Sequence, residues 1–250
     1  MPSAPAPEEP TLKILFCNCS HYDVVPDTVR AGVLGRLNAS GLAFRAVPDL
    51  CGLAARRDPA LKEIAGDDDI RIAACFPRTV RWLFHAAGAP LPERGVVIAN
   101  MRTLPVEGAA DALLAGLDAA PDAGGDAPPE PHAELAPGPD DWVPWFPIID
   151  YARCIDCGQC LNFCLFGVYD RGEDGRVDVR NPDKCKTNCP ACARVCPQTA
   201  IIFPKYRDRP INGDDVRPED LKRADMAVDA ERIRKTDVYE RLRARQRPGG

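Results

Sequence analysis

The sequence has no basic excess, no long apolar run and no recognisable set of catalytic residues. Its 32 lysines and arginines are outnumbered by 37 aspartates and glutamates, giving a formal net charge of −5, whereas nucleic-acid-binding domains are usually basic. Apolar runs such as residues 72–76 are far too short to span a bilayer. Neither a Ser/His/Asp set nor a phosphate-binding loop is present. We therefore expect no nucleic-acid partner, no membrane span and no catalytic residue.

The beginning of the chain carries no sign of a targeting segment. Residues 1–10 are rich in proline and have neither a basic start nor an apolar stretch. We expect them to be disordered and not to act as a signal peptide. These features predict a cytoplasmic protein, and disulfides are rare in that reducing compartment. The 12 cysteines are therefore expected to bind metal or take part in catalysis rather than to form a disulfide scaffold.

Residues 11–120 alternate short apolar stretches with segments that have helical spacing of apolar residues. Strands are predicted at residues 12–16, 43–47, 70–76 and 95–100. Helices are predicted at residues 26–37, at 53–65, from Pro77 onwards and at 107–120. This order predicts an α/β domain with a four-stranded parallel sheet between two layers of helices. In such sheets, ligands bind beyond the carboxyl ends of the strands.

Four cysteines of this domain follow predicted strands. Cys17 and Cys19 come at the end of the first strand, Cys51 shortly after the second and Cys75 at the end of the third. All four are therefore expected at the same edge of the sheet. Converging thiolates suit a third iron–sulfur cluster, a zinc ion or a dithiol redox site. The simpler alternative is four unrelated buried cysteines, because free cysteine is a common small core residue.

The same region resembles the N-terminal domain of the A subunit of heterodisulfide reductase. The resemblance is carried by Phe16-Cys-Asn-Cys-Ser20, by Cys51, by Ala73-Ala-Cys-Phe-Pro77 and by Val97-Ile-Ala-Asn-Met-Arg102. It implies a cluster held by Cys17, Cys19, Cys51 and Cys75. The flavin-binding fold that follows in that subunit has no counterpart here, since Gly32-x2-Gly35 lies inside a predicted helix. We expect no flavin or nucleotide in this chain.

Residues 11–120 also contain two histidines. His21 lies two residues after Cys19 and could replace a thiolate, but a solvated loop histidine is the commoner case. His85 falls on the predicted third helix and is expected to be a surface or core side chain.

The 44 positions from Cys154 to Pro197 hold eight of the 12 cysteines. They form two runs, Cys154-x2-Cys157-x2-Cys160-x3-Cys164 and Cys185-x3-Cys189-x2-Cys192-x3-Cys196-Pro197. With this spacing, three thiolates of a run hold one iron–sulfur cluster and the fourth ligates the other. One [4Fe–4S] cluster is then assigned to Cys154, Cys157, Cys160 and Cys196. The second is assigned to Cys164, Cys185, Cys189 and Cys192. Zinc is the weaker interpretation, because zinc sites use pairs of Cys-x2-Cys.

Residues 148–206 resemble the bacterial two-cluster ferredoxins. Each cysteine run is followed by an apolar segment, Gly167-Val-Tyr169 or Ile201-Ile-Phe203, and residues 172–175 separate two strands as a hairpin would. The halves form an internal repeat, which predicts a βαββαβ fold. In two places the sequence departs from the family. Leu165 stands where proline usually follows the fourth cysteine, and Cys185-x3-Cys189 has one residue more than usual.

Two segments beside the ferredoxin are expected to lack a core of their own. Residues 121–147 begin with a stretch of proline, alanine, glycine and acidic residues, typical of a flexible linker. Such a linker lets the two domains meet, or lets the ferredoxin swing. The linker ends in Trp142-Val-Pro-Trp145-Phe146, which either docks on a partner or, as we favour, covers the small ferredoxin core. Residues 207–250 form a charged tail, predicted to be helical and polar nearly all round.

Together these features predict an electron-transfer subunit of a larger flavin- or metal-dependent oxidoreductase. Its cofactors would be two [4Fe–4S] clusters in the ferredoxin domain, and a third is assigned to the N-terminal domain. Two alternatives remain at this point. One is a redox-sensing protein whose N-terminal cysteines form reversible disulfides. The other is an enzyme whose N-terminal cluster is catalytic.

Overall fold

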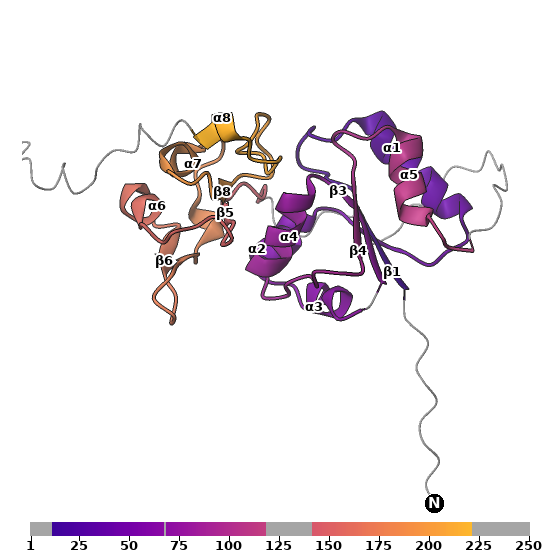
Figure 1. Ribbon diagram of the computed structural model, residues 1–250, viewed down its shortest axis with the longest axis horizontal. Coiled ribbons are helices and arrows are strands. Elements are labelled where there is room, and N and C mark those ends of the chain that lie inside the picture. The colour runs from indigo at the N-terminus through magenta and orange to yellow at the C-terminus, as the bar shows by residue number, and fades with distance from the viewer. Residues whose placement is uncertain (1–11, 68, 119–141, 222–250) are drawn as a thin grey trace, which may run out of the picture.

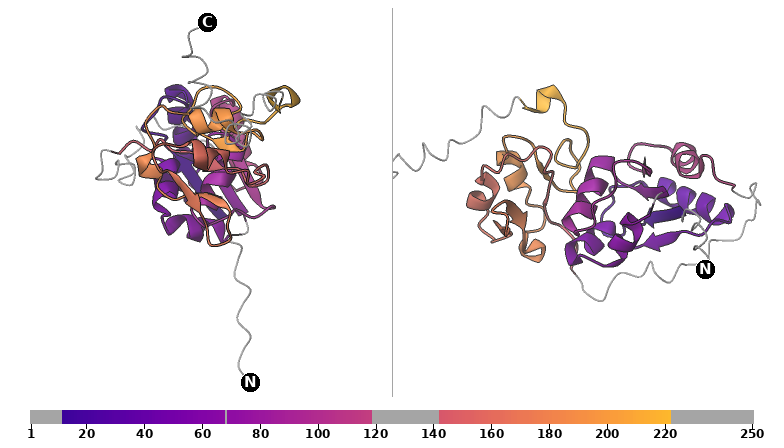
Figure 2. Two further views of the ribbon diagram at one scale, coloured as in Figure 1. Left: turned by 90° about the vertical axis from the view of Figure 1, so that its left-hand side faces the viewer. Right: turned by 60° about the horizontal axis from the view of Figure 1, so that its bottom comes forward.

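The computed structural model describes residues 12–67, 69–118 and 142–221. They form two parts that lie side by side (Figures 1 and 2), residues 12–118, called here the α/β part, and residues 142–221, the cysteine-rich part. In these ranges no helix is long and apolar enough to cross a membrane. The linker before residue 142 and the tail after residue 221 lie outside the described residues.

The α/β part is built on a four-stranded parallel sheet, as the sequence predicted. The strands are β1 (Leu12–Cys17), β2 (Arg45–Val47), β3 (Asp69–Ala74) and β4 (Val96–Asn100), in the order β2-β1-β3-β4. The register sets Cys17 opposite Val47 and Phe16 opposite Ala73. The carboxyl ends of β1, β2 and β3 therefore meet at one edge of the sheet.

Helices cover both faces of this sheet (Figure 1). The helices are α1 (Asp27–Ala39), α2 (Leu50–Arg56), α3 (Ala60–Ala65), α4 (Pro77–Ala86) and α5 (Val106–Leu114). Helices α1 and α5 pack together on one face, and α2 packs with α4 on the other. Most residues of the central strands β1 and β3 are buried, with Leu15, Ile70 and Ile72 at 0% exposure. This is the burial expected of a parallel sheet between helices.

One predicted helix, residues 53–65, is in fact two helices, α2 and α3. Helix α2 ends at Arg57, whose backbone is left-handed with φ 52°, and α3 begins after Pro59. Proline has no N–H to donate, and its ring clashes with the carbonyl four residues earlier, so it cannot lie inside a continuous helix. Helix α2 also begins earlier than predicted, because the Asp49 side chain caps it by accepting N–H bonds from Cys51 and Gly52.

The cysteine-rich part is made of two small antiparallel pairs and short helices. The elements are β5 (Ile148–Ile149), α6 (Gln159–Phe163), β6 (Tyr169–Arg171), β7 (Val177–Val179), η2 (Pro182–Lys184), α7 (Ala191–Val195), β8 (Ile201–Ile202) and α8 (Pro218–Leu221). Strand β5 pairs with β8, and β6 pairs with β7 as a hairpin. The ends of α6 and α7 are alike, since Cys164 has φ −73° and ψ 114° and Cys196 has φ −72° and ψ 115°.

The two parts share apolar packing. Phe146, Ile148 and Ile202 belong to the core that surrounds the parallel sheet. Trp145, next to Phe146, packs instead in the core of the cysteine-rich part, with its ring centroid 5.5 Å from that of Phe203. At the end of the predicted linker, Phe146 and Trp145 are thus buried in different cores, and the partly buried Trp142 packs against the core of the parallel sheet.

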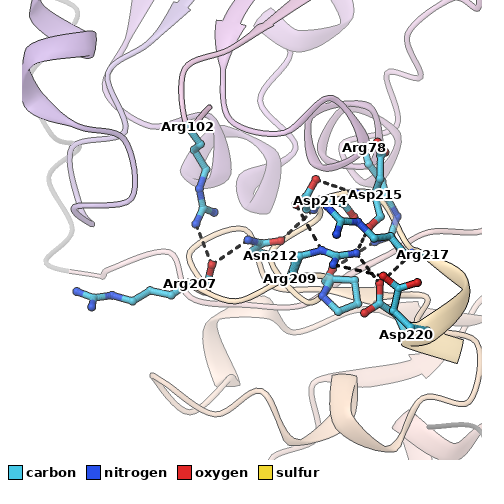
Figure 3. Close-up of polar contacts among 11 residues, drawn as sticks. Arg78, Arg102, Arg207, Arg209, Asn212, Asp214, Asp215, Arg217 and Asp220 are labelled. Carbon is cyan, nitrogen blue, oxygen red and sulfur yellow. Dashed lines mark hydrogen bonds and ion pairs between the residues drawn. The ribbon is translucent and has the colours of Figure 1, made fainter. Parts of the chain in front are cut away.

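Polar contacts also join the two parts, and Figure 3 shows one of them, from the Arg102 guanidinium to the Arg207 carbonyl. Arg78 of α4 forms a buried ion pair with Asp150 at 2.7 Å and donates to the Thr199 carbonyl at 2.7 Å. The Thr79 hydroxyl donates to the Asn212 carbonyl at 3.0 Å. Asn212 is itself buried, although the sequence assigned residues 207–250 to a tail. Residues 207–213 therefore pack against the α/β part.

We predict that Arg78→Met destabilises the protein by about 3–5 kcal/mol, because it leaves the Asp150 carboxylate buried without its partner. The urea midpoint of tryptophan fluorescence would report the loss. Glu63→Gln is the matched control, since the Arg45–Glu63 pair at 3.6 Å is exposed and worth at most about 1 kcal/mol. Equal effects of the two substitutions would contradict a buried ion pair between the two parts.

Candidate functional site

Four cysteines of the cysteine-rich part line one small cavity. They are Cys154, Cys157, Cys160 and Cys196, and the cavity measures about 20 Å³. Cys160 comes from α6, Cys196 from the end of α7, and the other two from the loop after β5. This group contains the fourth cysteine of the second run together with the first three of the first run. It is the set that the sequence assigned to one cluster.

The remaining four cysteines line a second, wider cavity. They are Cys164, Cys185, Cys189 and Cys192, and the cavity measures about 430 Å³. Its other walls are largely apolar and include Phe163, Leu165, Phe166 and Tyr169. Leu165 is 92% exposed, so this cavity opens at the protein surface.

The placement of the thiols bears on which metal group each cavity could hold. Among the described residues, no three His, Cys, Asp or Glu side chains are placed to hold a single metal ion. A zinc ion needs its ligand sulfurs about 2.3 Å from one centre. A [4Fe–4S] cluster instead binds each thiolate to a different iron, so its ligands lie farther apart. The arrangement fits a cluster better than a zinc ion.

Both cavities contain hydrogen-bond donors suited to sulfur ligands. The backbone N–H of Asp156 donates to Cys154 Sγ at 3.4 Å, and that of Ala200 donates to Cys196 Sγ at 3.3 Å. In the second cavity the hydroxyl of Tyr169 is buried and has no hydrogen-bond partner among the described residues. Burial, followed by the nearby Cys192 and Cys160 thiols, raises the pKa of Tyr169. An unpaired buried hydroxyl is costly, and a cluster sulfur would give it an acceptor.

Burial controls the ionisation of these thiols in the protein without metal. It raises the pKa of Cys160, Cys185 and Cys192 to about 12 in each case. A metal binds thiolates, so binding would release these protons.

The four cysteines of the α/β part come together at the carboxyl edge of the sheet, as expected. Cys17 is the last residue of β1, Cys19 lies in the following loop with φ 51°, and Cys75 directly follows β3. Cys51 lies in the first turn of α2 rather than in a loop. All four are buried. Burial raises the pKa values of Cys75 and Cys51, and the charge of the Cys19 thiolate raises both further.

A lysine from the cysteine-rich part completes this site. Lys205 follows β8, and its Nζ lies 3.2 Å from Cys19 Sγ and forms an ion pair with Asp49. The Leu50 backbone N–H donates to Cys17 Sγ at 3.3 Å. The α/β part therefore does not form the site alone.

These contacts divide the four thiols into one that ionises readily and three that do not. A hydrogen bond from Cys17 and the charge of Lys205 outweigh burial and lower the pKa of Cys19 to about 6. The same hydrogen bond, with burial, raises the pKa of Cys17 well above its usual value. Burial raises the pKa of Cys51, and that of Cys75 to about 12. Without metal, a single negative charge is favoured here.

The two histidines lie away from these sulfurs. His85 makes tilted ring contacts with Trp82 and Tyr151, with ring centroids 4.9 and 5.2 Å away. Burial lowers its pKa. His21 is partly exposed in the loop after Cys19.

Sequence reasoning missed three residues of these sites. Asp49 could have been found, since an aspartate directly before a helix is a usual N-cap. Tyr169 was placed correctly on a strand, but its unpaired hydroxyl is visible only in three dimensions. Nothing local in the sequence marks Lys205, because its partners Asp49 and Cys19 are 156 and 186 positions away.

Comparison with known proteins gives the class to which these sites belong. No family model matches the chain. An uncharacterized ferredoxin of Methanocaldococcus jannaschii is 49% identical over 63 residues, which are 25% of this chain and 42% of that protein. A second uncharacterized ferredoxin of that organism is 34% identical over 67 residues, covering 24% of this chain and 86% of that protein. The chain thus spans less than half of the first relative.

Other relatives carry related names. Ferredoxin-3 of a Nostoc species is 33% identical over 79 residues, 80% of its length. The pyruvate synthase subunit PorD of Methanothermobacter marburgensis is 38% identical over 60 residues, 67% of its length. The class is therefore that of iron–sulfur electron-transfer proteins. Through a segment of about a quarter of its length, the chain belongs to the ferredoxin family.

We predict that Leu165→Pro lowers the reduction potential of the cluster that the cysteine spacing assigns to Cys164. The Leu165 N–H donates to no described backbone carbonyl, and hydrogen bonds to cluster sulfurs favour the reduced state. Proline removes that N–H. The variant should fold, because Cys164 has the backbone conformation of Cys196, which precedes Pro197. Leu165→Ala keeps the N–H and is the control. Equal potentials of the two variants in a redox titration followed by EPR would sink the prediction.

Proposed function

We propose that this protein is the electron-transfer subunit of a larger oxidoreductase and carries three [4Fe–4S] clusters. Two are held by the cysteine-rich part, one by Cys154, Cys157, Cys160 and Cys196 and the other by Cys164, Cys185, Cys189 and Cys192. The observation that carries the proposal is the pair of cavities lined by these two sets. Such clusters supply one-electron chemistry. The surrounding βαββαβ arrangement is proposed to be that of a two-cluster ferredoxin.

The third cluster is assigned to the α/β part, with Cys17, Cys19, Cys51 and Cys75 as ligands. Support comes from four buried thiols at one sheet edge and from donors aimed at two of their sulfurs, Leu50 N–H and Lys205 Nζ. Cationic and N–H donors around thiolates are what a negatively charged cluster requires. The resemblance of this part to the heterodisulfide reductase A subunit also stays part of the proposal.

A dithiol redox switch is the second candidate for this site. The observation in its favour is the lowered pKa of Cys19, about 6, which makes it a thiolate at neutral pH. Against it, Cys19 is only 6% exposed, whereas redox-sensing cysteines are accessible to solvent. The cluster is therefore the better-supported function.

A protein partner is proposed to dock near the wider cavity, within the cytoplasm. Large apolar side chains are rarely exposed together without a role. Phe163, Leu165 and Phe166 are 49%, 92% and 42% exposed, and Lys184 and Lys186 are exposed on the neighbouring segment. We infer a partner with an apolar docking face and acidic residues around it. One relative is named as a pyruvate synthase subunit, and we propose a comparable place in an enzyme complex for this chain.

Iron and sulfide counts after anaerobic purification of the full chain test the number of clusters. We expect about twelve irons, because three cubanes contain four each. Cys160→Ser and Cys192→Ser should each remove one cluster of the cysteine-rich part, and Cys51→Ser should remove the third. About eight irons in the unmodified chain, unchanged by Cys51→Ser, would contradict a cluster in the α/β part. Zinc in place of iron would contradict the whole proposal.

A further inference from the structure

The ammonium group of Lys205 is buried in a site made by the other part of the chain. Lys205 is 4% exposed, and Asp49, its ion-pair partner, is 3% exposed. Burying an ammonium group is costly unless it is paired and hydrogen-bonded. An apolar residue would fill the same space without that cost, so packing alone does not explain a lysine here.

The backbone around Lys205 is held in place from both parts. The Arg102 guanidinium donates to the carbonyls of Pro204 at 3.2 Å and Tyr206 at 3.1 Å, the two residues that flank Lys205. The Phe203 N–H donates to the Ile211 carbonyl at 2.7 Å. Lys205 is therefore aimed at the site by a fixed main chain rather than by a mobile loop.

Asp49 alone does not account for the direction of the lysine. Its Oδ1 already accepts two backbone N–H groups, from Cys51 and Gly52. Only Oδ2 faces Lys205, whose Nζ also has Cys19 Sγ at 3.2 Å. The ammonium group thus lies between a carboxylate and a sulfur. The ammonium group pairs with the carboxylate and donates a hydrogen bond to the sulfur.

No other sulfur in the described residues has such a donor. The other donors to cysteine sulfurs are uncharged, such as the backbone N–H groups of Leu50, Asp156 and Ala200 and the thiol of Cys17, which donates to Cys19. A charged donor gives a hydrogen bond roughly twice as strong as a neutral one. Among the described residues, the proposed cluster of the α/β part would therefore be the one with a charged hydrogen-bond donor to a ligand sulfur.

We propose that Lys205 is a positioning residue for the cluster of the α/β part, which it reaches from the cysteine-rich part. It fixes Cys19 and stabilises the more negative, reduced state of the cluster, raising its reduction potential. The inference rests on the proposed third cluster. It makes the redox property of one part of the chain depend on the packing of the other.

The test compares Asp49→Asn/Lys205→Met with Asp49→Asn in the full chain, purified without oxygen. Asparagine still caps α2, and the double variant leaves no unpaired buried charge. Redox titration followed by EPR should show the third signal at a lower potential in the double variant than in Asp49→Asn. The two other signals should not move. Asp49→Asn/Lys205→Arg keeps a cation and should restore most of the shift, whereas Lys62→Met, at an exposed position of α3, should change nothing.

Iron content separates the possible failures. About twelve irons per chain with equal third potentials in Asp49→Asn and Asp49→Asn/Lys205→Met would overturn the role of Lys205 alone. About eight irons in the unmodified chain would overturn the third cluster and this inference with it. Loss of the third cluster in the Lys205→Met double variant, with recovery in the Lys205→Arg double variant, would support the positioning role.

Discussion

The contact of Lys205 with Asp49 and Cys19 joins the cysteine-rich part to the start of helix α2 and to the loop after β1. Asp49 has its position because it caps α2, and Cys19 because it follows β1. Lys205 can be buried only while both are in place. Together with the Arg78–Asp150 pair, it requires the two parts to stay together. A ferredoxin that swings on its linker would leave these charges unpaired, so we favour one joined unit.

This arrangement gives the chain a buried site at one end and a surface site at the other. The thiols of the α/β part are buried, with Lys205 of the cysteine-rich part in contact with Cys19, whereas the wider cavity opens beside the exposed Leu165. Electrons would then be exchanged with a partner at the surface site, and the enclosed site would be reached through the chain. This division fits an electron-transfer subunit better than a free thiol sensor, whose cysteines need access to solvent.

The sequence was informative where the physics is local or repeated. Alternating apolar segments predicted the parallel sheet, and the cysteine spacing predicted which thiols line each cavity. The prediction of a single helix at residues 53–65 was wrong, because Pro59 interrupts the segment and separates α2 from α3. The pairing of Lys205 with Asp49 could not be predicted, since it depends on how two separate parts pack. Likewise, the sequence assigned residues 207–250 to one tail, although Asn212 is buried against α4.

The most direct measurement is anomalous scattering at the iron edge from crystals of the full chain grown without oxygen. Three separate iron sites are expected. Two would lie in the cysteine-rich part, and the third would lie at the carboxyl edge of the parallel sheet, within reach of Cys17, Cys19, Cys51 and Cys75. Iron at the first two sites only, with free thiols beside Lys205, would contradict a cluster in the α/β part.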